Sequence, residues 1–373
     1  MARKQFLSFL LIFSLLFSCA SALAEADDDD DWDDNVDDAW EMEHPLHSGD
    51  YAYAPLDDGM VKITSYGGAD TEIVIPDTLD GKPVTAIGER AFYYSLSLTS
   101  VTIPDSVTHI SQKAFSCCFQ LTSITLPSGL TAIESGTFDL CKSLTTIDIP
   151  DSVAAIADDA FIGCKALQSF TLSPNHPYFF LADGALCRTA DSTLLLYPNA
   201  REPRTYRIPD GITAISAYAF YDCDLLESVV VPDSVTQLPA RAFSGCSALA
   251  SVSLPDSLTE IGTAAFSGCS ALTGIRIPAA ITEIINHTFS GCTSLATLEI
   301  PDSVTKIGDY AFFGCTSLTS IAIPDSVTAI GNGAFSNCTA LTLTVTPDSY
   351  AAEYAKANNI PYTYPDANDW LNN

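Results

Sequence analysis

Basic residues are scarce in this sequence. Only 16 of the 373 residues are Lys or Arg, against 46 Asp or Glu, and the formal net charge is −30. A surface with this excess of negative charge repels phosphate groups. Nucleic acid and anionic membranes are therefore poor partners for the protein as a whole, because both are bound through clusters of Lys and Arg.

The motifs of common catalytic and cofactor sites are also absent. The sequence has no glycine-rich phosphate loop, no dinucleotide fingerprint and no HExxH pair. The segment Gly245–Leu249 is similar to a nucleophile elbow, but it lacks the final glycine and recurs almost unchanged at Gly268–Leu272. A catalytic residue needs one unique environment, and repetition denies it. We therefore expect no enzyme activity and no cofactor.

The only long apolar run lies at the N-terminus, from Phe6 to Phe17, and it is too short to span a bilayer comfortably. It follows a basic start and precedes a small-x-small site that ends at Ala24, which predicts a secretory signal peptide over residues 1–24. An alternative is that Cys19 carries a lipid anchor, because the residues before it resemble the lipid-attachment box of bacterial lipoproteins, although Phe17 is bulkier than usual there. Either way we expect an exported protein, secreted or at the cell surface, that touches a membrane only through Cys19.

The segment after the leader is densely acidic. Residues 25–43 contain twelve of the acids, and a block of this density repels itself and stays extended. Calcium binding is the alternative, but the run lacks the glycine and the spaced glutamate of an EF-hand loop. We predict an acidic disordered spacer over residues 25–50.

Phenylalanine recurs at a fixed interval over most of the chain. Successive members are 23 positions apart, except for one step of 59, and they are Phe92, Phe115, Phe138, Phe161, Phe220, Phe243, Phe266, Phe289, Phe312 and Phe335. A fixed period of 20 to 29 residues with recurring leucine-type positions is typical of a leucine-rich solenoid. In each unit, alternating residues such as Ile321 and Ile323 before a proline predict a short strand. The Ala-Phe-x-x-Cys segment fits a turn of helix or an irregular arc.

The repeat "IPDSVTKIGDYAFFGCTSLTSI" resembles the BspA-like leucine-rich repeats of bacterial cell-surface and secreted proteins, from about residue 58 to residue 364. The resemblance implies an α/β repeat solenoid, a right-handed superhelix with short parallel strands, over residues 51–346. It also implies adhesion or another protein–protein interaction, with host matrix glycoproteins as targets. The general pattern places Asn or Cys where this chain has Ser106, Gly129 or Ser326, so the usual buried asparagine ladder is absent.

Both ends of the solenoid should be capped. Turn signals flank the strand-like run Val61–Tyr66, which predicts an N-terminal hairpin cap. Tyr350, Ala351, Tyr354 and Ala355 have helical spacing, which predicts a short amphipathic helix in a C-terminal cap and tail over residues 347–373.

The one long step between phenylalanines contains an enlarged repeat at 173–208, with strand-like runs at 185–188 and 193–197. We expect a central β-hairpin that projects from the solenoid. Arginine and aromatic residues gather here, as they do where partners bind. The candidate contact residues are Arg188, Arg201, Arg204, Arg207, Tyr178 and Phe179. Simple structural elaboration is the alternative.

Nine cysteines form a second column with the same period: Cys118, Cys141, Cys164, Cys223, Cys246, Cys269, Cys292, Cys315 and Cys338. Neighbouring members would stand about 4.8 Å apart with parallel Cβ directions, wider than a disulfide prefers. We therefore predict buried free thiols and no metal site, since a column spreads ligands along a rod. Cys117 and Cys187 lie outside the column and should be the more reactive cysteines.

The residue that lies between the two buried strand positions of each coil should face outward. Most residues in this row are small, and the exceptions are Asp148, Val230, Arg276 and Glu299. These four would give register to a ligand that lies along the sheet; a plain solvated sheet face is the alternative. We thus expect a protein or glycoprotein ligand. A structural envelope spacer without a ligand, and an accessory protein that binds polysaccharide, are the other interpretations.

Overall fold

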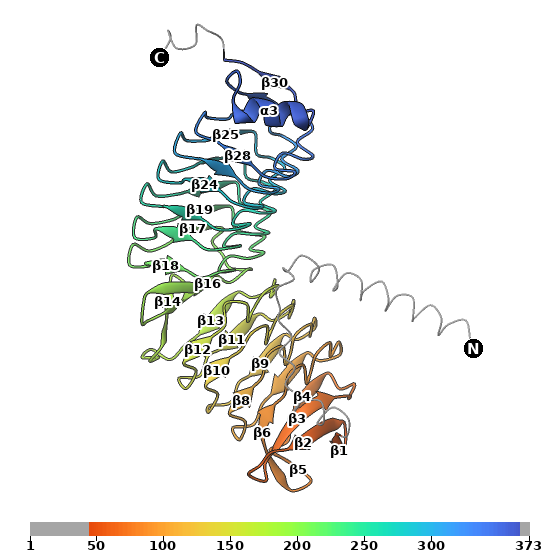
Figure 1. Ribbon diagram of the computed structural model, residues 1–373. Coiled ribbons are helices and arrows are strands. Elements are labelled where there is room, and N and C mark those ends of the chain that lie inside the picture. The colour runs from red at the N-terminus through yellow and green to blue at the C-terminus, as the bar shows by residue number, and fades with distance from the viewer. Residues whose placement is uncertain (1–44, 366–373) are drawn as a thin grey trace, which may run out of the picture. The chain divides into compact units, whose positions relative to one another are not determined.

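The structure is a computed structural model that describes residues 45–365. The predicted signal peptide, Cys19, most of the acidic segment and the tail beyond residue 365 lie outside the described residues. The compact unit that begins at Leu46 is a stack of coils, each contributing two short strands (Figure 1).

The first strand of each coil has three residues, and its central residue is buried. These strands are β4 (Glu72–Val74), β7 (Ser100–Thr102), β9 (Ser123–Thr125), β11 (Thr146–Asp148), β13 (Ser169–Thr171), β17 (Thr205–Arg207), β19 (Ser228–Val230), β21 (Ser251–Ser253), β23 (Gly274–Arg276), β25 (Thr297–Glu299), β27 (Ser320–Ala322) and β29 (Thr342–Thr344). The column divides into sheets of two or three strands, in which neighbours pair in parallel and, in most coils, each residue lies beside its equivalent in the next repeat, as Thr146 does beside Ser169. The expected solenoid with short parallel strands is confirmed.

A second column of shorter parallel strands was not expected. It comprises β6 (Lys82–Ile87), β8 (His109–Ile110), β10 (Ala132–Ile133), β12 (Ala155–Ile156), β18 (Ala214–Ile215), β20 (Gln237–Leu238), β22 (Glu260–Ile261), β24 (Glu283–Ile284), β26 (Lys306–Ile307) and β28 (Ala329–Ile330). In most of them the second residue is buried and the first is not. Apart from β6, which has six residues, each of these strands has two residues, and two are too few for a visible alternation, so the sequence signal is weak.

Helix is much rarer than the predicted α/β class implies. Within the described part of the chain, the solenoid coils contain turns between their strands, and the α-helix is α3 (Tyr350–Ala357) in the C-terminal cap. The Ala-Phe-x-x-Cys segments stay irregular because the residue before the final cysteine position has a positive φ, as Cys117 does at 61°, and in most coils so does the residue before the alanine, as Lys113 does at 57°. A left-handed residue cannot continue a right-handed helix. The solenoid is therefore built of strands and turns.

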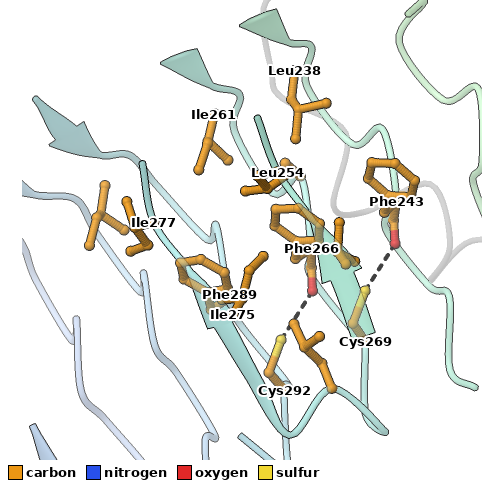
Figure 2. Close-up of a cluster of buried hydrophobic side chains, with 14 of the residues drawn as sticks. Leu238, Phe243, Leu254, Ile261, Phe266, Cys269, Ile275, Ile277, Phe289 and Cys292 are labelled. Atoms are coloured by element: carbon orange, nitrogen blue, oxygen red, sulfur yellow. Dashed lines mark hydrogen bonds between the residues drawn. The ribbon is translucent and has the colours of Figure 1, made fainter. Parts of the chain in front are cut away.

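The core is a ladder of stacked phenylalanine rings (Figure 2). Phe243, Phe266 and Phe289 lie 5.5 and 5.7 Å apart between centroids, with interplanar angles of 2° and 3°. Beside the rings, each column thiol donates a hydrogen bond to the ring residue's carbonyl in the previous coil, as Cys269 does to Phe243 O (3.1 Å). The described cysteines are all free, and the members of the column are buried except Cys338, which is half-buried.

The prediction that Cys117 and Cys187 are reactive was wrong. Both are buried, and burial raises the pKa of the Cys187 thiol to about 12. Cys117 has a φ of 61° and occupies the place that Gly268 takes, at 74°, in a later coil. A buried thiol with so high a pKa forms almost no nucleophilic thiolate.

The ends carry the expected caps. At the N-terminus, β1 (Leu46–Ser48), β2 (Tyr51–Pro55) and β3 (Val61–Tyr66) form an antiparallel sheet that joins the second column through β6, which also pairs with β5 (Thr78–Leu79). Residues 46–50, which the prediction placed in the spacer, therefore belong to the N-terminal cap. At the other end, Ser349 caps α3 by accepting from Ala352 N, and β30 (Tyr362–Thr363) extends β29.

The enlarged repeat does not project as a free hairpin. Its strands are β14 (Phe179–Ala182), β15 (Ala185–Arg188) and β16 (Thr193–Leu196), and both β15 and β16 are largely buried. Leu186 and Leu196 pack into a core that begins at Tyr53, which we call the N-terminal block. Cys187 and Leu194 pack into a core that ends at Ala355, which we call the C-terminal block. The two faces of the inserted sheet thus join two cores.

Tyr197 takes the phenylalanine position in the enlarged repeat. It precedes Phe220 by one repeat period, and the two rings stack at 5.4 Å. The Cys223 thiol, which follows Phe220, donates to Tyr197 O as it would to a phenylalanine carbonyl. The long step is therefore one extended coil, from Phe161 to Tyr197, followed by one coil of ordinary length.

Candidate functional site

Outward-facing side chains of the first strand column form a row in the C-terminal block. Parallel pairing aligns them one coil after another, as Arg207 lies beside Val230, Val230 beside Ser253, and Arg276 beside Glu299. Their neighbours along the row are Ala322 and Thr344. We call this row, with the turns along its edge, the strand-face groove.

The groove has two hollowed parts that share Arg276. One has a volume of about 800 Å³ and is lined by β23, β25 and β27, with Arg276 and Glu299 as its charged side chains. The other has a volume of about 610 Å³ and lies between Arg207 and Arg276. Most of the remaining lining is small, such as Gly274 and Ser320, so backbone and hydroxyl groups are accessible there.

Each arginine of the groove is held by an aspartate of a Pro-Asp turn. Arg276 Nη1 lies 2.6 Å from Asp256 Oδ1, and Arg207 Nη2 lies 3.5 Å from Asp210 Oδ1. Asp233, between these two turns, lines the same hollow. These pairs are exposed, so they orient the guanidinium groups more than they stabilise the fold. The surface presents both signs of charge at fixed positions.

Arg207 belongs to this groove. Its position in the sequence had predicted that it belongs to the insertion. It is the last residue of β17, in the strand column. A signal for this placement was present, because Arg207-Ile208-Pro209 repeats as Arg276-Ile277-Pro278, three repeat periods later. The structure thus brings together Arg207, Val230, Arg276 and Glu299.

Asp148 is not part of the same row. It lies on β11, and the strands β14, β15 and β16 of the enlarged repeat come between β13, the next strand of its column, and β17, where the row begins. Its carboxylate accepts a hydrogen bond of 2.6 Å from Thr171 Oγ1 in the next coil. The enlarged repeat therefore separates Asp148 from the other three strand residues.

The remaining arginines of the enlarged repeat are engaged locally. Arg188 binds Asp191 through Nε (3.0 Å) and Nη2 (2.8 Å), and this arginine holds the pKa of the Asp191 carboxyl at about 2. Arg204 bridges Glu202 and Glu227, both at 3.3 Å. The Arg201 guanidinium covers Gly184 and takes the space that a side chain there would need. These contacts hold the coil together.

The two aromatic candidates differ. Tyr178 is exposed, whereas Phe179 is 2% exposed and packs in the core of the N-terminal block. Phe179 is therefore a core residue, which corrects its selection as a contact residue. Phe180 and Leu181, which follow it, are the exposed ones.

Within residues 45–365, no group of three or more His, Cys, Asp or Glu side chains could hold a metal ion. The same residues include no helix long and apolar enough to cross a membrane.

The chain belongs to the family of BspA-type leucine-rich repeat regions. The family model matches residues 71–180 and 208–343 in six copies, and the unmatched gap falls within the enlarged repeat. Proteins with such repeats are typically non-catalytic binding proteins. A search of curated proteins finds no match.

Solved bacterial structures share the fold. A leucine rich cell surface protein of Faecalibacterium prausnitzii is 31% identical, over 84% of this chain and 97% of its own, with a TM-score of 0.51. A leucine-rich repeat protein of Eubacterium ventriosum is 24% identical, over 78% and 93%, with a TM-score of 0.60. The pneumococcal vaccine antigen PcpA is 16% identical, over 87% and 99%, with a TM-score of 0.55. The last two show likeness of fold alone.

Proposed function

We propose that the protein is exported to the bacterial cell surface or secreted, and that it binds a protein or glycoprotein ligand in the strand-face groove. The observation that carries the proposal is the alignment of Arg207, Arg276 and Glu299 along one hollowed row in which most other lining side chains are small. An elongated ligand can approach the backbone of such a surface, and the charged groups then set its register.

Two observations support an extracellular location. The relative from Faecalibacterium prausnitzii is named a cell surface protein. Residues 1–24 of this chain have the pattern of a secretory signal. Adhesion to host matrix glycoproteins is the specific form of the proposal that the family resemblance favours.

The test is a binding screen of the purified chain against matrix glycoproteins, serum proteins and glycans at physiological and high salt. The informative variant is Arg207→Ala/Arg276→Ala. Its matched control is Lys306→Ala, which removes an exposed cation that also pairs with an acid one coil away, Glu283, but lies in the second strand column. A saturable hit that the double variant weakens at least tenfold, and the control leaves unchanged, supports the groove.

A second variant separates the groove from the enlarged repeat. Arg188→Ala/Arg204→Ala removes two arginines that are held by acids of that region and lie outside the groove. Loss of binding in this variant, with the groove variant unaffected, would move the ligand site to the enlarged repeat.

A structural spacer without its own ligand is the alternative function. It is favoured by the pairing of Arg188, Arg204, Arg207 and Arg276 with nearby carboxylates, which leaves little unpaired positive charge at these arginines to attract an acidic partner. No saturable hit in the screen, from a chain that is folded by circular dichroism, supports this alternative.

A further inference from the structure

The enlarged repeat has an unpaired strand edge. In its sheet the order is β14-β15-β16-β18, so β14 is the outermost strand, and no described strand pairs with its outer side (Figure 1). Thr189 N–H donates to Tyr178 O (2.9 Å), which fixes the phase of the β14–β15 ladder. Alternate residues therefore direct their backbone groups outward, and these are Phe179 and Leu181.

The same edge carries exposed apolar side chains. Tyr178, Phe180 and Leu181 are 44%, 36% and 40% exposed, within four consecutive residues. An exposed apolar edge strand invites pairing with another chain, and proteins commonly protect such edges with Lys, Pro or a bulge. Residues 178–182 contain none of the first two, and the bulge in this sheet lies on β15.

The charge of the region favours a second copy of this chain as the partner. The chain has a net charge of −30, so most surfaces of two copies repel each other. Apart from Arg207, which lies in the strand-face groove, residues 173–208 contain three arginines and three acids, a net charge of zero. Two copies that meet at this repeat avoid the repulsion that they would meet elsewhere.

We propose that the protein forms a two-fold symmetric homodimer in which β14 pairs antiparallel with β14 of a second copy. Because Phe179 and Leu181 direct their backbone groups to the open edge, one register of the two β14 strands is selected. Phe179 N–H already donates to His176 Nδ1 (3.2 Å), but its carbonyl is directed to the open edge. Leu181 N–H of each copy donates to Phe179 O of the other. The two-fold axis then passes beside Phe180, and the two Phe180 rings face each other as a non-hydrogen-bonded pair.

The inference is independent of the proposed ligand, because β14 lies outside the strand-face groove. It concerns an isologous contact, the commonest kind in homo-oligomers. A continuous sheet from one copy to the other would then connect the two enlarged repeats.

The first experiment is sedimentation equilibrium of the purified chain from 1 to 200 micromolar, at low and high salt. We expect a monomer–dimer equilibrium that tightens as salt screens the repulsion between acidic copies. Leu181→Lys places a charge on the pairing edge and should weaken dimerisation at least tenfold. Val74→Lys is the matched control, because Val74 is an apolar residue on β4 with 73% exposure, and its variant should dimerise normally.

The second experiment tests the register. In Phe180→Cys, the two new thiols face each other across a pair whose Cα separation of about 4.5 Å suits a disulfide. An added thiol oxidant should crosslink this variant into a dimer and leave Val74→Cys monomeric, since the native thiols of the described chain are almost all buried.

A protein that is still monomeric at 200 micromolar, at both low and high salt, overturns the proposal. So does a dimer that Leu181→Lys leaves unchanged, because the contact would then lie elsewhere. A dimer that responds to Leu181→Lys but does not crosslink through Phe180→Cys overturns the register and retains the edge.

Discussion

The N-terminal and C-terminal blocks repeat the same coil with different regularity. At the residue before the cysteine column, the C-terminal block has Gly245, Gly268, Gly291 and Gly314, all with φ between 70° and 79°. In the N-terminal block the equivalent residues include Tyr94, Cys117 and Leu140, and their φ values of 57° to 61° are also left-handed. Stacking on neighbouring coils therefore imposes this conformation, whether or not the residue favours it.

A second difference concerns buried charge. The residue after Phe138 is Asp139, whereas the residues after Phe243, Phe266 and Phe289 are all serine. Burial is the main cause that raises the pKa of the Asp139 carboxyl to about 6, and the nearby Asp159 adds to the effect. The C-terminal block has the same two features in fewer of its coils, chiefly at Asp222, which has a φ of 55° and a pKa raised mainly by burial. We therefore expect the N-terminal block to be the less stable block.

The largest expected effect comes from the ladder. Phe266→Ala should lower the free energy of unfolding by about 3–5 kcal/mol, because it removes a fully buried ring. Phe161→Ala should lower it by about 1 kcal/mol less than Phe266→Ala does, because the stack ends at Phe161. This ring stacks on Phe138 alone, and its other ring neighbour, Phe170, meets it edge-on. Urea unfolding measures both. Equal losses would mean that the break in the ladder does not weaken it.

The buried acid gives a prediction that depends on pH. The folded pKa of Asp139 is above the value of an unfolded aspartate, so its folded state binds the proton more tightly, and stability is lost as pH rises from about 4 to about 6. Asp139→Ser should therefore stabilise the protein at pH 7 by roughly 1–3 kcal/mol. It should have little effect at pH 3.5. Urea unfolding at the two pH values checks this, and a gain of equal size at both would contradict the role of ionisation.

The left-handed position gives a smaller effect in both directions. Gly268→Ala should cost about 1 kcal/mol, because φ is 74° there and alanine disfavours that region. Asp222→Gly, at the equivalent position with φ of 55°, should stabilise the fold by about 1 kcal/mol. The variant removes the 3.5 Å contact between Lys165 and the Asp222 carboxylate, and Lys165 still has the Asp224 carboxylate at 2.9 Å. Thermal unfolding of the two variants should shift in opposite directions, and shifts of the same sign would count against backbone strain as the cause.

The smallest effect is expected at the surface. Lys306→Ala removes an exposed pair with Glu283 in which the charged atoms lie 3.8 Å apart. Such pairs contribute little, so the free energy of unfolding should change by less than about 0.5 kcal/mol. A larger loss in urea unfolding would show that charges along the second strand column act as a network.

Much of the fold could be predicted because one signal is repeated. The register of Phe138, Cys141 and Pro150 recurs in coil after coil, and this was enough to place the first strand column and the column of thiols. The two caps were predicted from other signals, the turns around Val61–Tyr66 and the helical spacing of residues 350–355. The second strand column could not be found in the same way, because its two-residue strands have no measurable alternation. For the Ala-Phe-x-x-Cys segment a turn of helix and an irregular arc both stayed open, because its left-handed residue is glycine in some coils and a residue such as Leu140 in others.

The candidate site was harder to predict because it depends on contacts between coils. Arg207 was grouped with its neighbours in sequence, although its register matches Arg276, and Phe179 was selected for its residue type although it is buried. In the enlarged repeat, Tyr197 takes the phenylalanine position of a normal coil. The different residue type and the longer spacing from Phe161 make this position hard to find in the sequence. Charge and residue type indicated a region, and only the structure separates its core side chains from its surface side chains.

The fixed interval of the ladder also bears on how such a protein changes over generations. Each ring and thiol of the C-terminal block contacts the equivalent groups one coil away, as Phe266 contacts Phe243 and Phe289. Recombination that duplicates or deletes one repeat unit there would join identical surfaces and leave every remaining contact intact. The enlarged repeat has no such freedom, because its two faces meet different cores. Lineages should therefore differ in the number of coils on either side of it while the junction itself is kept.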